Sequence, residues 1–155
     1  MKSSDIEGVV VKRLRAIPDE RGRLMEIMRC DDDFFQKFGQ VYMTTAFPGV
    51  VKGWHYHKKQ TDHMAVVRGM MKIVLYDQRD NSPTKGNVME LFAGEHNPIL
   101  VGIPPGVFHG FKCISEVEAI VINTPTESYD PKDPDEYRVH PHENDIPYDW
   151  DRKDG

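Results

Sequence analysis

The sequence predicts an all-β protein, a sandwich or barrel built from short strands. Runs rich in β-branched or alternating residues, such as 7–14 and 118–123, are separated by Gly and Pro turns. Helical patterns are nearly absent. The exception is 31–38 (DDDFFQKF), where Asp31 can cap one short helix and three phenylalanines share a face. Many short strands with so little helix are typical of a sandwich or barrel.

The expected strands follow one another with turns at 18–22 (PDERG) and 48–49 and a polar loop at 77–86. Residues 124–155 are acidic and rich in proline, but they contain three tyrosines and Trp150. We therefore expect this tail to pack on the barrel, so that 1–155 forms a single domain. The expected strands are 7–14, 23–28, 40–46, 50–56, 64–67, 70–76, 87–93, 98–103, 107–113 and 118–123.

Composition narrows the function classes. The 155 residues suffice for one domain with a real core, and 39% of them are hydrophobic. A net charge of -5 provides no basic field for nucleic acid. No apolar run reaches 18 residues and the N-terminus MKSSDIEG has no apolar signal core, so we expect neither membrane insertion nor export. Cys30 and Cys113 have no motif spacing and are expected to be reduced thiols in a cytoplasmic protein.

Histidines mark the candidate site. His55 and His57 are two residues apart, which places both imidazoles on one face of a strand. Asp62 follows, and His109 comes after a Pro-Gly turn on a later strand. These four side chains suit a divalent transition metal with open coordination positions. Alternatively, an imidazole in a pocket can act as a general base, and the spacing leaves both uses open.

The spacing of these residues resembles the two cupin motifs. The first runs from Gly49 through the histidines to Gly69, with Asp62 where cupins usually have Glu. The second contains Pro104, Gly106 and His109. It departs from the usual motif at its first position, where Pro98 replaces Gly, and at its last, where Cys113 replaces Asn. This resemblance implies a double-stranded β-helix, or jelly roll, with the histidines facing its mouth.

A second resemblance extends over nearly the whole chain. The segments that carry it, in order, are 19–22 with Glu26, 32–39, 49–55, 82–86, 103–111, Tyr129 with Pro131, and 146–150. Through these segments the chain resembles the dTDP-4-dehydrorhamnose 3,5-epimerase family. The resemblance implies an epimerase or isomerase of a nucleotide-linked 4-keto-6-deoxy sugar, which needs no metal, flavin or nicotinamide. A base removes a proton next to the ketone, an enolate forms, and an acid returns a proton to the other face.

The resemblance implies a role for each matching residue. His55 corresponds to the base and Tyr129 to the acid. Arg21 and Lys52 correspond to residues that contact the diphosphate, Arg21 commonly from a partner subunit. Glu26 and Gln40 correspond to contacts with the nucleotide base or sugar, and His57 and His109 are expected to hydrogen-bond the keto oxygen or a hydroxyl. Proteins of this kind usually form homodimers, and residues 5–14 are expected to complete the partner's sheet.

Two departures keep alternatives open. Asp62 occupies the position of a pocket lysine that stabilises the enolate, and His57 replaces a Gln. The segment 55–59 (HYHKK) resembles instead the nucleotide-sugar 3,4-ketoisomerases. A metal-binding cupin with His55, His57, Asp62 and His109 as ligands, or a non-catalytic sugar binder, also fits. A register shift of one residue would turn His63 inward in place of Asp62.

Overall fold

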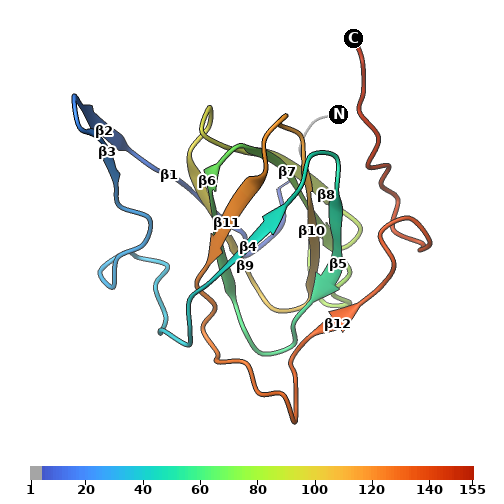
Figure 1. Ribbon diagram of the computed structural model, residues 1–155. Coiled ribbons are helices and arrows are strands. Elements are labelled where there is room, and N and C mark those ends of the chain that lie inside the picture. Colours follow the sequence, from blue (N-terminus) through green and yellow to red (C-terminus); the bar gives the residue numbers. More distant parts are fainter. Residues whose placement is uncertain (1–4) are drawn as a thin grey trace.

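The computed structural model describes residues 5–155, which form two five-stranded antiparallel sheets and a separate two-stranded hairpin (Figure 1). The first sheet has the order β1 (Val10–Arg13), β9 (Ile99–Ile103), β6 (Asp62–Arg68), β11 (Ala119–Asn123) and β4 (Tyr42–Ala46). The second has the order β12 (Tyr137–Arg138), β5 (Val51–Tyr56), β10 (Val107–Cys113), β7 (Met70–Asp77) and β8 (Val88–Gly94). The hairpin pairs β2 (Ala16–Asp19) with β3 (Gly22–Met25). The predicted all-β jelly roll is confirmed.

The main core lies between the two sheets. Strand β11 shows the alternation expected of a strand with one face inward, because Ala119, Val121 and Asn123 are buried while the residues between them are half-buried. The other inward residues come from both sheets, so closing one sheet over the other removes them all from water. They include Met64, Val66, Met71, Ile73, Leu75, Val101, Ile103, Val107 and Phe111.

The central strands do not alternate, because both of their faces are covered. Residues 62–66 and 99–103 are all buried. Outside the first sheet, Leu14, Ala65 and Leu100 pack under the segment that contains Phe34. Outside the second sheet, Trp150 from the C-terminal tail packs on Trp54, with ring centroids 5.0 Å apart. Strands covered on both faces are continuous apolar runs, which explains why period-two patterning is weak there.

The predicted helix at 31–38 is wrong, and the described chain has no helix. This segment forms turns, with one i to i+3 bond from Phe35 N–H to Asp32 O at 2.9 Å. The carboxylate of Asp32 forms an ion pair with Lys12, at 2.7 Å, and accepts a hydrogen bond from the backbone N–H of Arg29. The phenylalanines also separate, since Phe34 packs inward while Phe38 remains 62% exposed. Long-range contacts therefore override a weak local preference.

Residues 5–14, which are expected to complete a partner's sheet, include β1 at the edge of the first sheet. β1 pairs with β9 of its own chain, from Val10 opposite Gly102 to Arg13 opposite Ile99. The β2–β3 hairpin pairs with no other strand of the described chain, and it projects from the body of the protein (Figure 1). No helix that could span a membrane is found among residues 5–155.

Asp77 at the end of β7 organises the loop that follows it. Its carboxylate accepts hydrogen bonds from Arg79 (Nε, 2.9 Å), Ser82 (Oγ, 2.5 Å) and Thr84 (Oγ1, 2.6 Å). Burial, the largest influence, acts to raise the pKa of Asp77, but these donors outweigh it and hold the pKa well below its ordinary value. Arg79 also donates to the carbonyl of Glu7, at 2.7 Å, and so ties the N-terminal segment to this loop.

We expect Asp77→Asn to lower the free energy of unfolding by about 2–4 kcal/mol at pH 7, because charged hydrogen bonds to a buried carboxylate are lost. Because the pKa is depressed in the folded state, this stabilisation is present above the ordinary value of 3.8 and is lost as pH falls below it. Urea unfolding at several pH values should therefore show the difference from wild type shrinking in acid. Asp80→Asn, an exposed carboxylate in the same loop, is the control and should change stability little.

Candidate active site

A cavity of about 950 Å³ opens beside the histidines and is the larger of the two described. Its wall combines strands β4 and β5 with the segment that follows β11. A cavity of this size suits a small organic ligand. The predicted site residues on its wall are Gln40, Lys52, His55, His57 and Tyr129.

A β-bulge places the wall residues of β5. His55 pairs with His109 and Lys52 pairs with Phe111, so two residues of β5, Gly53 and Trp54, stand opposite the single Gly110 of β10. The extra residue lets Lys52 and His55 both line the cavity although their spacing is odd, while the ring of Trp54 packs on Trp150 of the tail. Gly53 and Gly110 allow this approach, since a Cβ on Gly53 would lie 2.8 Å from the Gly110 Cα.

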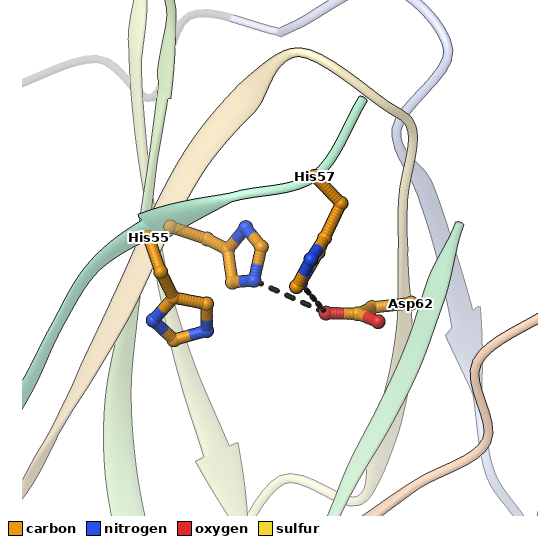
Figure 2. A group of neighbouring side chains, drawn as sticks. His55, His57 and Asp62 are labelled. Carbon is orange, nitrogen blue, oxygen red and sulfur yellow. Dashed lines mark hydrogen bonds and ion pairs between the residues drawn. The ribbon is translucent and has the colours of Figure 1, made fainter. Parts of the chain in front are cut away.

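Asp62 and the histidines form a buried cluster behind this wall (Figure 2). The Asp62 Oδ2 atom lies 3.1 Å from Nε2 of His57 and 3.1 Å from Nε2 of His109. Its other oxygen accepts a hydrogen bond of 2.8 Å from the side-chain amide of Gln60. The structure thus points Asp62 inward, whereas His63 faces the other side of the sheet and donates from Nδ1 to Thr124 O at 2.9 Å.

Contacts within the cluster shift the pKa values of its members in different directions. Burial acts to raise the pKa of Asp62, but contact with His109 and His57 outweighs it and lowers that pKa well below its ordinary value. Burial acts to lower the pKa of His57, but Asp62 outweighs it and raises that pKa. For His55, burial and then the neighbouring His109 lower the pKa well below its ordinary value. His55 is therefore a neutral imidazole at neutral pH, ready to accept a proton.

Two tail residues of the site were not found by sequence reasoning. The Asp135 carboxylate accepts the backbone N–H groups of 58–60 at 2.8–3.0 Å, and its carbonyl accepts the Nδ1–H of His57 at 2.5 Å. Arg138 on β12 lies opposite His55 in the pairing of β12 with β5, and it lines the cavity. The only sequence signal for either was the acidic, prolyl composition of the tail, which assigns no contact.

Two predicted site residues lie away from the cavity of their own chain. Arg21, at the tip of the hairpin, has a side chain that is 86% exposed and pairs with Asp19. Glu26 follows the hairpin and pairs with Arg29 at 3.0 Å. Neither lines the cavity, and Figure 1 shows the hairpin leading away from the barrel. A substrate-binding role for them within one subunit is thus not supported by this geometry.

Comparison with known proteins matches this architecture to one family. The sequence profile described as dTDP-4-dehydrorhamnose 3,5-epimerase covers residues 3–155. The chain belongs to this family. Membership makes it a nucleotide-sugar epimerase or isomerase, as its resemblance to the family implied.

Proteins similar to this chain come from distant organisms. The spore coat polysaccharide biosynthesis protein SpsL of Bacillus subtilis is 40% identical over 145 residues, which are 94% of this chain and 96% of SpsL. The probable low-salt glycan biosynthesis epimerase Agl13 of Haloferax volcanii is 39% identical over 147 residues, 94% of this chain and 90% of Agl13. A crystal structure of a dTDP sugar isomerase from Desulfovibrio desulfuricans G20 has a TM-score of 0.88 at 33% identity, covering 94% of this chain and 92% of that one.

Proposed function

We propose that His55 removes a proton from the carbon next to the ketone of a nucleotide-linked 4-keto-6-deoxy sugar and that Tyr129 returns one. The imidazole accepts the proton, and the electron pair of the C–H bond moves into an enolate. The Tyr129 phenol then donates its proton to that carbon from the other face, which inverts the centre. The observation that carries this proposal is a neutral, partly buried His55 in the same cavity as an exposed tyrosine hydroxyl.

Neighbouring residues support this assignment. Gln40 accepts the backbone N–H of Tyr129 at 3.1 Å, so it holds the segment that carries the acid. Lys52 has no acidic partner among residues 5–155, and its ammonium contacts only the Thr44 hydroxyl, at 3.4 Å. It is therefore an available cation for the substrate diphosphate. The proposed proton transfers need no flavin or nicotinamide.

A nucleotide-sugar 3,4-ketoisomerase is the second candidate. His55 and His57 line the same cavity with ring centroids 5.8 Å apart, and one favours the neutral form while the other favours the charged form. Such a pair suits proton transfer between adjacent carbons, since one ring accepts while the other donates. In that reaction the carbonyl would move from carbon 4 to carbon 3, whereas an epimerase leaves it in place.

Solvent isotope exchange tests the proposed function. The protein is mixed with dTDP-4-keto-6-deoxyglucose in D2O, and the sugar is followed by NMR and mass spectrometry. We expect deuterium at a carbon adjacent to the ketone, with the carbonyl still at carbon 4. Deuterium at carbon 4 with a ketone at carbon 3 would identify the ketoisomerase instead. Binding without exchange, for this and other nucleotide-linked 4-keto sugars, would contradict both and indicate a non-catalytic binder.

We also propose a homodimer in which the hairpin of each subunit packs on β4 of its partner. β4 is the edge of its sheet, and its exposed face presents Met43 and, just beyond it, Phe47, which are 60% and 68% exposed. The hairpin is equally apolar, with Ile17 and Leu24 exposed, and an isolated two-stranded hairpin is only marginally stable. Because β4 also lines the cavity, this contact would bring Arg21 towards the partner's substrate.

Arg21→Gln is expected to raise the KM for the nucleotide sugar about 10–100-fold with little change in kcat, as for a lost charged hydrogen bond to a phosphate. Steady-state kinetics across substrate concentrations measure this. Arg15→Gln, also exposed on the N-terminal segment, is the matched control and should leave KM unchanged. A monomer with full activity, shown by light scattering at the assay concentration, would contradict the shared site.

A further inference from the structure

The backbone partners of two buried histidines fix which ring nitrogen carries a hydrogen. The His57 Nδ1 atom lies 2.5 Å from the carbonyl of Asp135, and the His109 Nδ1 atom lies 3.0 Å from the carbonyl of Val107. A carbonyl oxygen only accepts hydrogen bonds, so Nδ1 carries the hydrogen in both rings. In a neutral imidazole the remaining nitrogen, Nε2, then holds a lone pair.

Both Nε2 atoms point at the same carboxylate oxygen. The Asp62 Oδ2 atom stands 3.1 Å from each of them, and an ionised carboxylate also has only lone pairs to offer. The His109 Nε2 atom is buried and has no hydrogen bond of acceptable geometry among residues 5–155. Three lone-pair atoms cannot stay in contact unless positive charge lies between them. Two protons or one divalent cation would meet this need.

We propose that His57 Nε2, Asp62 Oδ2 and His109 Nε2 bind one divalent transition-metal ion. Two imidazoles and a carboxylate are a donor set that such ions favour. Each proposed ligand is oriented by an outer partner, namely Asp135 O, Gln60 Nε2 and Val107 O, as is usual around protein metal ions. These partners hold the ligands in position before any ion arrives.

His55 is set apart from this ligand set. Its ring has no hydrogen-bond partner within the described chain, so no outer group fixes its tautomer. It packs edge-on against His109, with ring centroids 4.2 Å apart, and its nitrogen lies within 4.8 Å of the other three donor atoms. His55 lines the cavity, and we assign it as the base rather than as a fourth ligand, in contrast to the four-ligand arrangement considered from the sequence.

This step rests on the proposed function. A bound ion would explain why Asp62 stands at the position where the family usually has a lysine. Asp62 together with a divalent ion has a net charge of plus one, the same as a lysine ammonium. The enolate oxygen that forms when His55 takes a proton would therefore face positive charge in both cases. Without the ion, Asp62 would place negative charge behind the developing enolate.

Metal content and Co²⁺ binding test the site. Protein purified without chelator should contain about one equivalent of a divalent transition metal per chain by mass spectrometry. After chelator treatment, Co²⁺ alone should restore one equivalent with visible ligand-field bands. Asp62→Asn, nearly the same size as the native residue, should weaken Co²⁺ binding at least about 100-fold. His140→Gln, an exposed histidine in the tail, is the control and should bind as wild type does.

The outcomes separate the site from the reaction. Wild-type protein that binds no Co²⁺, or an Asp62→Asn variant that binds it as wild type does, would overturn the metal site. Full isotope exchange by metal-free protein would overturn the role of the ion while leaving the epimerase proposal intact. Stoichiometric metal in protein that exchanges no deuterium into any keto-sugar would support the site and refute the proposed reaction. Circular dichroism of the variant distinguishes lost ligation from lost folding.

Discussion

Replacement of His55 by glutamine is expected to slow deuterium exchange into the keto-sugar by about 10²–10⁴-fold, the range for loss of a positioned general base. Glutamine fills a similar volume, but its amide does not accept a proton at neutral pH. The native imidazole is suited to this task because burial and the adjacent His109 lower its pKa and keep it neutral. The loss should appear mainly in kcat, because the proton is transferred only in the reacting complex.

The measurement is the initial rate of deuterium incorporation at saturating substrate, with thermal unfolding recorded for each variant. His96→Gln is the matched control, since His96 is exposed on the loop between β8 and β9 and lies outside the cavity. An His55→Gln variant with near-native exchange and a native unfolding curve would remove His55 as the base. The neighbouring His57 would then be the first residue to replace.

The histidine part of this site was predictable because side chains alternate along a strand. The spacing of His55 and His57 fixes a shared face whatever the strand's surroundings. The turn before His109 placed a fourth group on another strand. What spacing could not decide was whether Asp62 or His63 points inward, because a shift of one residue exchanges them. The structure decides this through β6, where Asp62 contacts His57 and His109 while His63 packs against the ring of Phe34.

The remaining features depend on contacts that no local pattern encodes. The bulge that places Lys52 and His55 on the same cavity depends on a register shift in the pairing of β5 with β10. Asp135 lies 78 residues after His57, yet it fixes that ring and the loop beside it. The helix expected at 31–38 does not form: Asp32 binds Lys12, 20 residues earlier, and Asp31, the expected cap, pairs with Arg29. Long-range pairing, rather than propensity, decided each of these features.

Tyr129→Phe is expected to separate exchange from inversion. His55 can still remove the proton and return a deuteron to the face from which the proton left, so exchange should stay within about tenfold of wild type. Formation of the inverted sugar should fall by about 10²–10⁴-fold, because no acid remains to deliver a proton from the other face. Phenylalanine keeps the ring, so the shape of the cavity wall changes only by one hydroxyl.

Proton NMR of a single reaction reports both quantities, since one spectrum shows both the loss of the sugar proton signal on deuteration and the coupling pattern of the epimer. Tyr137→Phe is the matched control, because Tyr137 stacks on Tyr56 outside the cavity and its hydroxyl has no proposed role. If Tyr129→Phe forms the inverted product at the wild-type rate, another group supplies the proton. If exchange and inversion instead fall together by the same factor, Tyr129 acts in the step that forms the enolate, and its place as the second-face acid is refuted.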